Sequence, residues 1–305
     1  MNEEYLWNRS GEPDTETARL ERLLAPLRYR EPAPVRPGRN VAWWLAGVAA
    51  AVALVCIPLL QRAPMTAWKL ASGSGLRAGQ WVETGGSGST RIESAQTGAV
   101  EIDAGSRVRV LAASAGEEHL NLQQGTIHAL IWAPPGRFVV DTPSAKTIDL
   151  GCRYTLQVGD GGVGLLTVEA GWVAFESKGT ESFIPEGAAC VTRPVSGPGT
   201  PYFSDAMPAL ISALARFDTA RDAEALGSAL ASLRRRDALT SWHLLTRTRG
   251  EQRAQVFDRF AALVALPPAV TRQAMLDGDP AAFDAAWNAL DLGDTAWWRE
   301  WKRKW

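Results

Sequence analysis

Cysteine and histidine are scarce in this sequence, and neither sign of charge dominates it. The three cysteines have no CxxC spacing, which excludes a zinc ribbon and a disulfide-dense small domain. His119, His128 and His243 lack the spacing of a histidine-built metal site. The 32 basic and 33 acidic residues give a net charge of -1, which excludes a nucleic-acid binder that depends on bulk positive charge. Without a P-loop or a GxSxG elbow, we expect no enzyme, no metal and no cofactor.

One segment has no charge at all. The run Val41–Leu60 holds 20 uncharged residues, the length needed to cross roughly 30 Å of hydrocarbon. Arg39 and Arg62 flank it, and Trp43 and Trp44 stand near its start, where indole rings favour the membrane interface. A buried core helix and a cleaved signal peptide are the alternatives, but forty residues precede the run and no small-residue cleavage site follows it. The pattern predicts an uncleaved transmembrane helix.

The basic residues beside this run predict its orientation. Residues 21–40 contain five Lys or Arg residues, and residues 61–80 contain three. The excess on the N-terminal side favours an N-terminus in the cytoplasm. We therefore expect a single-pass protein of the cytoplasmic membrane, with residues 61–305 in the periplasm.

The sequence pattern of the tail, residues 1–40, predicts two short amphipathic helices. Pro13, Asp14 and Glu16 suit the start of a helix. A leucine stripe follows at spacing i, i+3, i+4 and i+7: Leu20, Leu23, Leu24 and Leu27. Forty residues cannot bury such a stripe alone, so it needs another protein, a second copy or the bilayer surface as partner.

In residues 61–200 the apolar side chains recur at every second position, and this period of two predicts an all-β domain. Apolar residues alternate in pairs: Val100 and Ile102, Val108 and Val110, Leu120 and Leu122, Phe138 and Val140, Leu166 and Val168. Glycines break the pattern at intervals near ten residues: Gly98, Gly105, Gly116, Gly125, Gly136, Gly151, Gly171, Gly179 and Gly187. About twelve short strands in a sandwich, a jelly roll or a short β-helix are expected.

Two features of the β region have more than one interpretation. Residues 159–164 match GxGxxG, but a strand follows them where a nucleotide site needs a helix, so they predict a turn. Cys152 and Cys190 would close a loop of about 40 residues if they formed a disulfide. Two buried thiols are the alternative.

Residues 201–305 predict an all-α domain of five or six short helices. The apolar positions return to helical spacing, as in Leu210, Leu214 and Phe217, and Asp279-Pro280 is a typical helix start. The end of the chain, residues 297–305, is rich in Trp and basic residues. It indicates either contact with an anionic lipid surface or a last helix that packs on its own domain.

The β region contains a series of short motifs in a fixed order. They are Gly79-Gln80-Trp81-Val82-Glu83-Thr84, then Leu122 to Ile127 around Gly125, then Phe138 to Ala145 with Thr142-Pro143, then Gly151-Cys152-Arg153-Tyr154, then Val168 to Val173 around Gly171, and a late Gly187. In this order and spacing the region resembles the FecR family of membrane regulators. Where the family has Gly-Thr-x-Phe, this chain has Gly151-Cys152-Arg153-Tyr154.

The resemblance implies a single-pass envelope regulator that controls an extracytoplasmic-function sigma factor. A sigma factor on the cytoplasmic side and an outer-membrane transducer outside are the implied partners, and no nucleic acid is bound directly. The expected architecture is a multidomain membrane protein: a tail, one transmembrane helix, an all-β FecR-like sandwich or jelly-roll domain, and an all-α C-terminal domain. The alternative function is an envelope scaffold or glycan-binding module without sigma-factor control.

Overall fold

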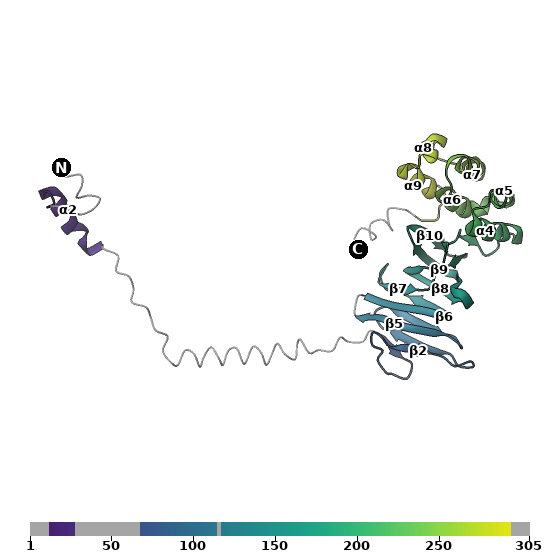
Figure 1. Ribbon diagram of the computed structural model, residues 1–305, viewed down its shortest axis with the longest axis horizontal. Coiled ribbons are helices and arrows are strands. Elements are labelled where there is room, and N and C mark those ends of the chain that lie inside the picture. Colours follow the sequence, from purple (N-terminus) through teal and green to yellow (C-terminus); the bar gives the residue numbers. More distant parts are fainter. Residues whose placement is uncertain (1–11, 28–67, 115–116, 294–305) are drawn as a thin grey trace. The chain divides into compact units, whose positions relative to one another are not determined.

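The computed structural model describes residues 12–27, 68–114 and 117–293. The chain divides into two compact units, Met1–Arg62 and Ala63–Trp305. The described part of the first unit contains helix α2 (Thr15–Leu24) and the 3-10 turn η1 (Ala25–Leu27). The second unit contains the described strands and the other described helices (Figure 1). The predicted domain boundaries at residues 40, 60 and 200 stay predictions.

The described strands of the second unit belong to one hydrogen-bonded sheet of 13 strands. They are β1 (Lys69–Leu70), β2 (Trp81–Glu83), β3 (Thr90–Ser94), β4 (Gly98–Ile102), β5 (Arg107–Ser114), β6 (Glu117–Ile131), β7 (Phe138–Asp141), β8 (Lys146–Val158), β9 (Gly164–Ser177), β10 (Thr180–Pro185), β11 (Ala188–Arg193), β12 (Gly197–Pro198) and β13 (Tyr202–Phe203). Neighbouring strands are antiparallel except for the pair β6 and β7, which is parallel.

The longest strands, β6, β8 and β9, change neighbours along their length. The first half of β6 pairs with β5 and β7, and its second half pairs with β4 and β8. The change falls at Gly125, whose φ of 100° is open to glycine and costly for other residues. In β8 the register shifts between Asp149 and Cys152, around Gly151, and Gly171 of β9 lies opposite. Extra residues of this kind bend a strand without ending it.

These bends correct the interpretation of glycines as strand ends. Gly125, Gly151 and Gly171 have positive φ values and lie inside strands, at or next to register shifts that the hydrogen-bond ladder passes through. Gly179, by contrast, lies in the turn between β9 and β10, as the pattern predicts. Residues 159–164 also form the predicted turn: the short 3-10 helix η2 (Asp160–Gly162) joins β8 to β9.

The described residues depart from the predicted membrane-protein architecture in two respects. No helix among the described residues is both long and apolar enough to cross a membrane. The predicted span Val41–Leu60 lies outside the described residues. The β region is also one continuous mixed sheet, where a two-sheet sandwich or jelly roll was expected, because the bent strands carry the hydrogen-bond ladder from one set of neighbours to the next.

Helices follow the sheet in the sequence. They are α4 (Pro208–Ala220), α5 (Ala223–Ser232), α6 (Ala238–Arg247), α7 (Gly250–Leu263), α8 (Arg272–Asp277) and α9 (Pro280–Asn288), with the 3-10 turn η3 (Arg235–Asp237) before α6. Their apolar stripes are buried, as Leu210, Leu214 and Phe217 of α4 show. The Asp279 side chain caps α9 by accepting the Ala281 N–H at 2.9 Å, with Pro280 in the first turn.

The helices and the sheet share one hydrophobic core. Buried side chains of the strands and of the helices form a single contiguous cluster. The helices gather beside the β9–β10 end of the sheet (Figure 1). There Trp287 of α9 lies 5.9 Å from the rings of Trp172 on β9 and Phe183 on β10, measured between ring centroids.

Candidate functional site

Helix α2 presents the leucine stripe to solvent. The Asp14 side chain accepts the Thr17 N–H at 2.8 Å, which satisfies one of the free donors at the helix start. Leu20, Leu23 and Leu24 are 58%, 66% and 56% exposed, and no residue of α2 is buried. Leu27 ends the following turn η1, and its side chain lies outside the described part of the structure. Within the described residues, this leucine face of α2 therefore has no cover.

Such a face can bind a protein. Burying one leucine side chain removes apolar surface from water and is worth roughly 1.5–3 kcal/mol. Amphipathic helices commonly dock in hydrophobic grooves through residues at this spacing. The second predicted helix of the tail, with Tyr5, Leu6 and Trp7, lies outside the described residues.

The first FecR-like motif builds a turn. Gly79 adopts a φ of 88°, and its N–H donates to the Val110 carbonyl at 2.7 Å. The Thr84 hydroxyl donates to the Asp103 carbonyl at 2.6 Å and accepts the Ser106 N–H at 2.8 Å. Both residues thus fix the chain around β2 and β5.

Two further motifs hold neighbouring backbone segments close to one another. A Cβ on Gly125 would lie 2.4 Å from the Cα of Ser106, so a glycine is required there. The Thr142 hydroxyl donates to the Ala145 carbonyl at 2.9 Å and accepts the Ala145 N–H at 3.0 Å. It closes the turn that holds Pro143 between β7 and β8.

The motif Gly151-Cys152-Arg153-Tyr154 forms the bulge in β8. Asp149 accepts the Gly151 N–H at 2.7 Å and also the thiol of Cys152. Burial raises the pKa of Asp149 from 3.8 to about 7, while these two hydrogen bonds oppose the rise. Tyr154 is 1% exposed and belongs to the core. Gly171 faces this bulge from β9, and Gly187, with a φ of 76°, turns the chain before β11.

Cys152 and Cys190 are both free and buried. Strand β9 lies between them: Cys152 is opposite Gly171, and Cys190 is opposite Leu166. The two cysteines are thus separated by two strand spacings of about 4.8 Å each, with an additional offset along β9. This separation exceeds the Cα–Cα distance that a disulfide can span. The Cys190 thiol donates to the Gly199 carbonyl at 3.2 Å, and burial raises its pKa to about 12. The cysteines therefore have structural partners of their own.

The family-motif positions consequently serve the fold. They form turns, bulges and core contacts, spread along the sheet, and they do not meet in one site. Nor does the described part of the chain contain a group of three or more His, Cys, Asp or Glu side chains placed to hold a metal ion.

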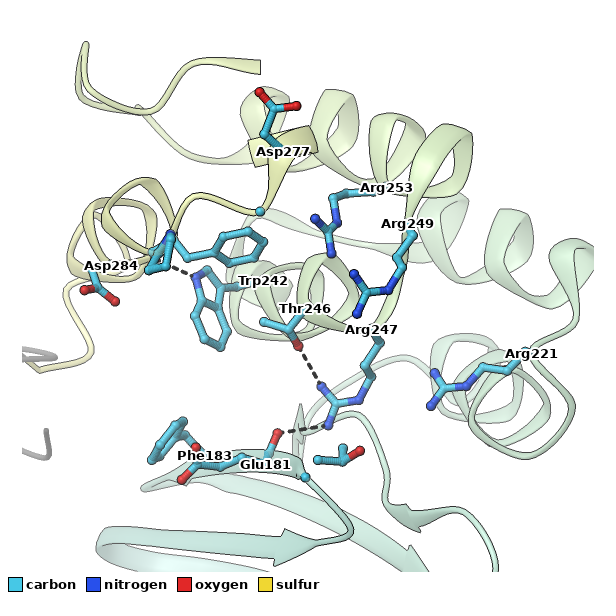
Figure 2. Close-up of a pocket in the computed structure, with 15 residues that line it drawn as sticks. Glu181, Phe183, Arg221, Trp242, Thr246, Arg247, Arg249, Arg253, Asp277 and Asp284 are labelled. Carbon is cyan, nitrogen blue, oxygen red and sulfur yellow. Dashed lines mark hydrogen bonds between the residues drawn. The ribbon is translucent and has the colours of Figure 1, made fainter. Parts of the chain in front are cut away.

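A second cluster was not predicted from the sequence. Arg221, Arg247, Arg249 and Arg253 come from the end of α4, the end of α6, the α6–α7 link and the first turn of α7, and they line one pocket (Figure 2). Its floor includes the β9–β10 hairpin. No local motif marks these four arginines, since only the packing of the helices against the hairpin brings them together.

His243 supports this junction. Its Nε2 lies 3.1 Å from the Phe183 carbonyl, and its Nδ1 lies 3.2 Å from the Arg247 guanidinium. Burial lowers the pKa of His243 well below 6.5, and Arg247 lowers it further. The ring is therefore a neutral link between β10 and α6.

Comparisons with known proteins show only a weak structural similarity over part of the chain. No protein-family model matches the chain, and no curated protein matches it. Two crystal structures of a putative anti-sigma factor from Parabacteroides distasonis ATCC 8503, at 1.65 Å and 2.50 Å resolution, are similar to part of it. Both alignments have 13% sequence identity and a TM-score of 0.36, and both cover 45% of this chain. The chain spans 65% and 64% of these neighbours, just under two thirds of their length. No family model confirms the FecR resemblance, so it rests on the motifs in the sequence.

Proposed function

We propose that the chain is a non-enzymatic regulator that binds an extracytoplasmic-function sigma factor through the leucine face of α2. The observation that carries the proposal is the exposure of Leu20, Leu23 and Leu24 on one side of a capped helix. The FecR-like order of motifs in the sheet supports the choice of a sigma factor as partner. In this proposal the sheet and the helices α4–α9 form the part that receives a signal, from an outer-membrane transducer.

The test compares two faces of the same helix. Replacing Leu20 and Leu24 by Gln removes two apolar contacts at i and i+4 while keeping residues that favour a helix. Two lost leucine contacts should weaken binding by about a hundredfold or more, at about 1.4 kcal/mol per tenfold. The matched control replaces Glu21 and Arg22 by Gln on the other side of the helix, which leaves the net charge of the chain unchanged.

The full chain and each variant are titrated, by calorimetry, with the sigma factor encoded beside the gene for this chain. We expect the natural chain and the Glu21/Arg22 control to bind alike, and the Leu20/Leu24 variant to lose binding. Equal binding by the leucine variant contradicts the interface. If no sigma-factor gene lies nearby and polysaccharide or secretion genes do, the envelope-scaffold alternative takes its place.

The location of the chain is part of the proposal. We propose that residues 68–293 lie outside the cytoplasm, where a signal from the envelope can reach them. A reporter that is active only in the periplasm, fused after Trp305, should be active in cells. A silent periplasmic reporter, together with an active cytoplasmic reporter at the same position, contradicts this location and leaves the binding test above unaffected.

A further inference from the structure

A pocket of about 630 Å³ lies where the β9–β10 hairpin meets the helices. Its walls include Trp242, Thr246 and Phe283 from α6 and α9, and Glu181 and Phe183 from the hairpin (Figure 2). We call it the arginine pocket, after Arg221, Arg247, Arg249 and Arg253. This volume lies within the usual range of sites for small organic ligands.

Two of the arginines are fixed by backbone carbonyls. The Arg247 guanidinium donates to the Gly199 carbonyl at 2.9 Å and to the Ser182 hydroxyl at 2.5 Å. The Nε of Arg253 donates to the Thr248 carbonyl at 2.7 Å. Carbonyl partners hold these guanidiniums in place without neutralising them, although the Asp218 carboxylate in the protein interior favours the charged form of Arg247. Burial lowers the pKa of Arg253, and the neighbouring Arg249 lowers it further, as expected for cations that repel one another.

The other two arginines that line the pocket, Arg221 and Arg249, are exposed. Arg221 lies 5.1 Å from the ring centre of Phe217, and Arg249 is the residue before α7. None of the four guanidiniums forms a salt bridge within residues 12–27, 68–114 and 117–293. The guanidinium groups of Arg247, Arg249 and Arg253 point toward the pocket (Figure 2).

Three acidic residues also line the pocket, and their direction decides the sign of its charge. The carboxylates of Asp277 and Asp284 point away from the arginines in Figure 2. Asp277 accepts the Gln273 side-chain amide at 2.9 Å. Glu181 meets Arg247 through its backbone carbonyl, at 3.5 Å. With four arginines and three acidic residues, two of which point away, the lining of the pocket has a net positive charge.

The start of α7 adds to this positive field. Arg249 is the N-cap residue, and its side chain makes no capping hydrogen bond. The N-terminal end of a helix carries a partial positive charge, so a cation is unfavourable there and an anion is favourable. Oxyanions pair well with forked guanidinium groups.

We propose that the arginine pocket binds a small organic oxyanion that carries two or more phosphate or carboxylate groups. One anionic group would lie between Arg249 and Arg253 at the start of α7, and another would face Arg221 and Arg247. Phe183 and Phe283 would contact the apolar part of the ligand. The site does not depend on the sigma-factor proposal, because it belongs to the second unit of the chain and α2 to the first.

The test uses the full chain and two defined probes, inorganic pyrophosphate and propane-1,2,3-tricarboxylate, titrated by calorimetry at an ionic strength of about 0.05 M, where screening is weak. The variant combines Arg221→Asn with Arg249→Gln. Asn tolerates the left-handed backbone of Arg221, whose φ is 55°. The control combines Arg216→Gln with Arg272→Gln, which removes two exposed guanidiniums outside the pocket and changes the net charge equally.

We expect at least one probe to bind the natural chain and the control with equal affinity. Binding to the Arg221/Arg249 variant should fall by about tenfold or more for each lost guanidinium, because charge-assisted hydrogen bonds are lost. Which probe binds more tightly distinguishes phosphate from carboxylate ligands. Equal weakening in the control, unchanged binding by the variant, or no binding of either probe at about 5 mM would each overturn the proposal.

Discussion

At the residue scale, a close contact as well as the backbone angle requires a glycine at position 171. A Cβ at this position would lie 2.1 Å from the Gly151 carbonyl oxygen, which belongs to the facing bulge in β8. Gly171 also has a φ of 77°. We predict that Gly171→Ala lowers the free energy of unfolding by about 2–5 kcal/mol, from the strained angle and the displaced backbone together. Urea unfolding of the full chain measures it.

Gly179 is the matched control for this prediction. Its φ is 78°, yet nothing lies within 4 Å of a Cβ built there. Gly179→Ala should therefore cost only the backbone strain, about 1–2 kcal/mol. Equal losses in the two variants would show that the carbonyl of Gly151 does not constrain β9.

Asp149 makes the stability of the fold depend on pH. Burial raises its folded pKa to about 7, against 3.8 for a solvated carboxyl, so the folded chain holds a proton that the unfolded chain releases. The stabilisation is complete below the unfolded pKa and is lost as the pH rises through the folded pKa. We predict that the free energy of unfolding falls between pH 4 and 7, by on the order of 4 kcal/mol at most from this residue.

Asp149→Asn isolates that contribution. The amide keeps the size of the side chain and an acceptor for the Gly151 N–H but does not titrate. Buried Glu118, whose pKa is raised mainly by burial, is present in both proteins and cancels in the comparison. Urea unfolding at several pH values should give a flatter profile for the variant. Parallel profiles would mean that Asp149 does not carry the pH dependence.

At the scale of the elements, the sequence predicts strands better than it predicts their lengths. Alternating pairs such as Val108 and Val110, or Leu120 and Leu122, are fully buried, as their period of two predicts. The same pattern cannot distinguish a glycine that ends a strand from one that bends it. That difference depends on the facing strand, as at Gly125 and Gly171, and a facing strand is not visible in local sequence.

Helix α4 is joined to the end of the sheet by one buried carboxylate. Asp218 accepts the Thr200 N–H and the Thr200 hydroxyl, each at 2.7 Å. Asp218→Ala leaves both donors buried without an acceptor, so we predict a loss of about 2–4 kcal/mol in the free energy of unfolding. Asp218→Asn still offers an oxygen to the N–H and an amide to the hydroxyl, and should cost less than about 1 kcal/mol. Similar losses in both variants would mean that the charge, not the hydrogen bonding, matters.

At the scale of the whole molecule, the two candidate sites differ in how far the sequence predicts them. The leucine face of α2 follows from spacing alone, because one short helix carries it. The arginine pocket draws on α4, α6, α7 and the β9–β10 hairpin. No spacing in the sequence relates Arg221 to Arg253, since the packing of separate elements sets their distance. Sites of the second kind require the fold.

The same packing predicts that the sheet and the helices unfold together. Trp287 of α9 lies 4.7 Å from the ring of Trp242 on α6 and 5.9 Å from the rings of Trp172 and Phe183 on the sheet. It is 2% exposed, so Trp287→Ala should cost about 3–5 kcal/mol. Because these rings join both parts of one core, the loss should lower the unfolding transition of strands and helices equally.

Hydrogen exchange followed by mass spectrometry measures the two parts separately. In the natural chain, peptides from β9 and from α6 should exchange with the same free energy of opening, and in Trp287→Ala both should fall by the same amount. Phe257→Ala is the comparison within the helices: it is 7% exposed on α7 and removes a buried ring away from the aromatic cluster at the sheet. If Trp287→Ala releases α9 and α6 while β9 stays protected, the helices are a separate folding unit, and the arginine pocket lies at a joint that can open.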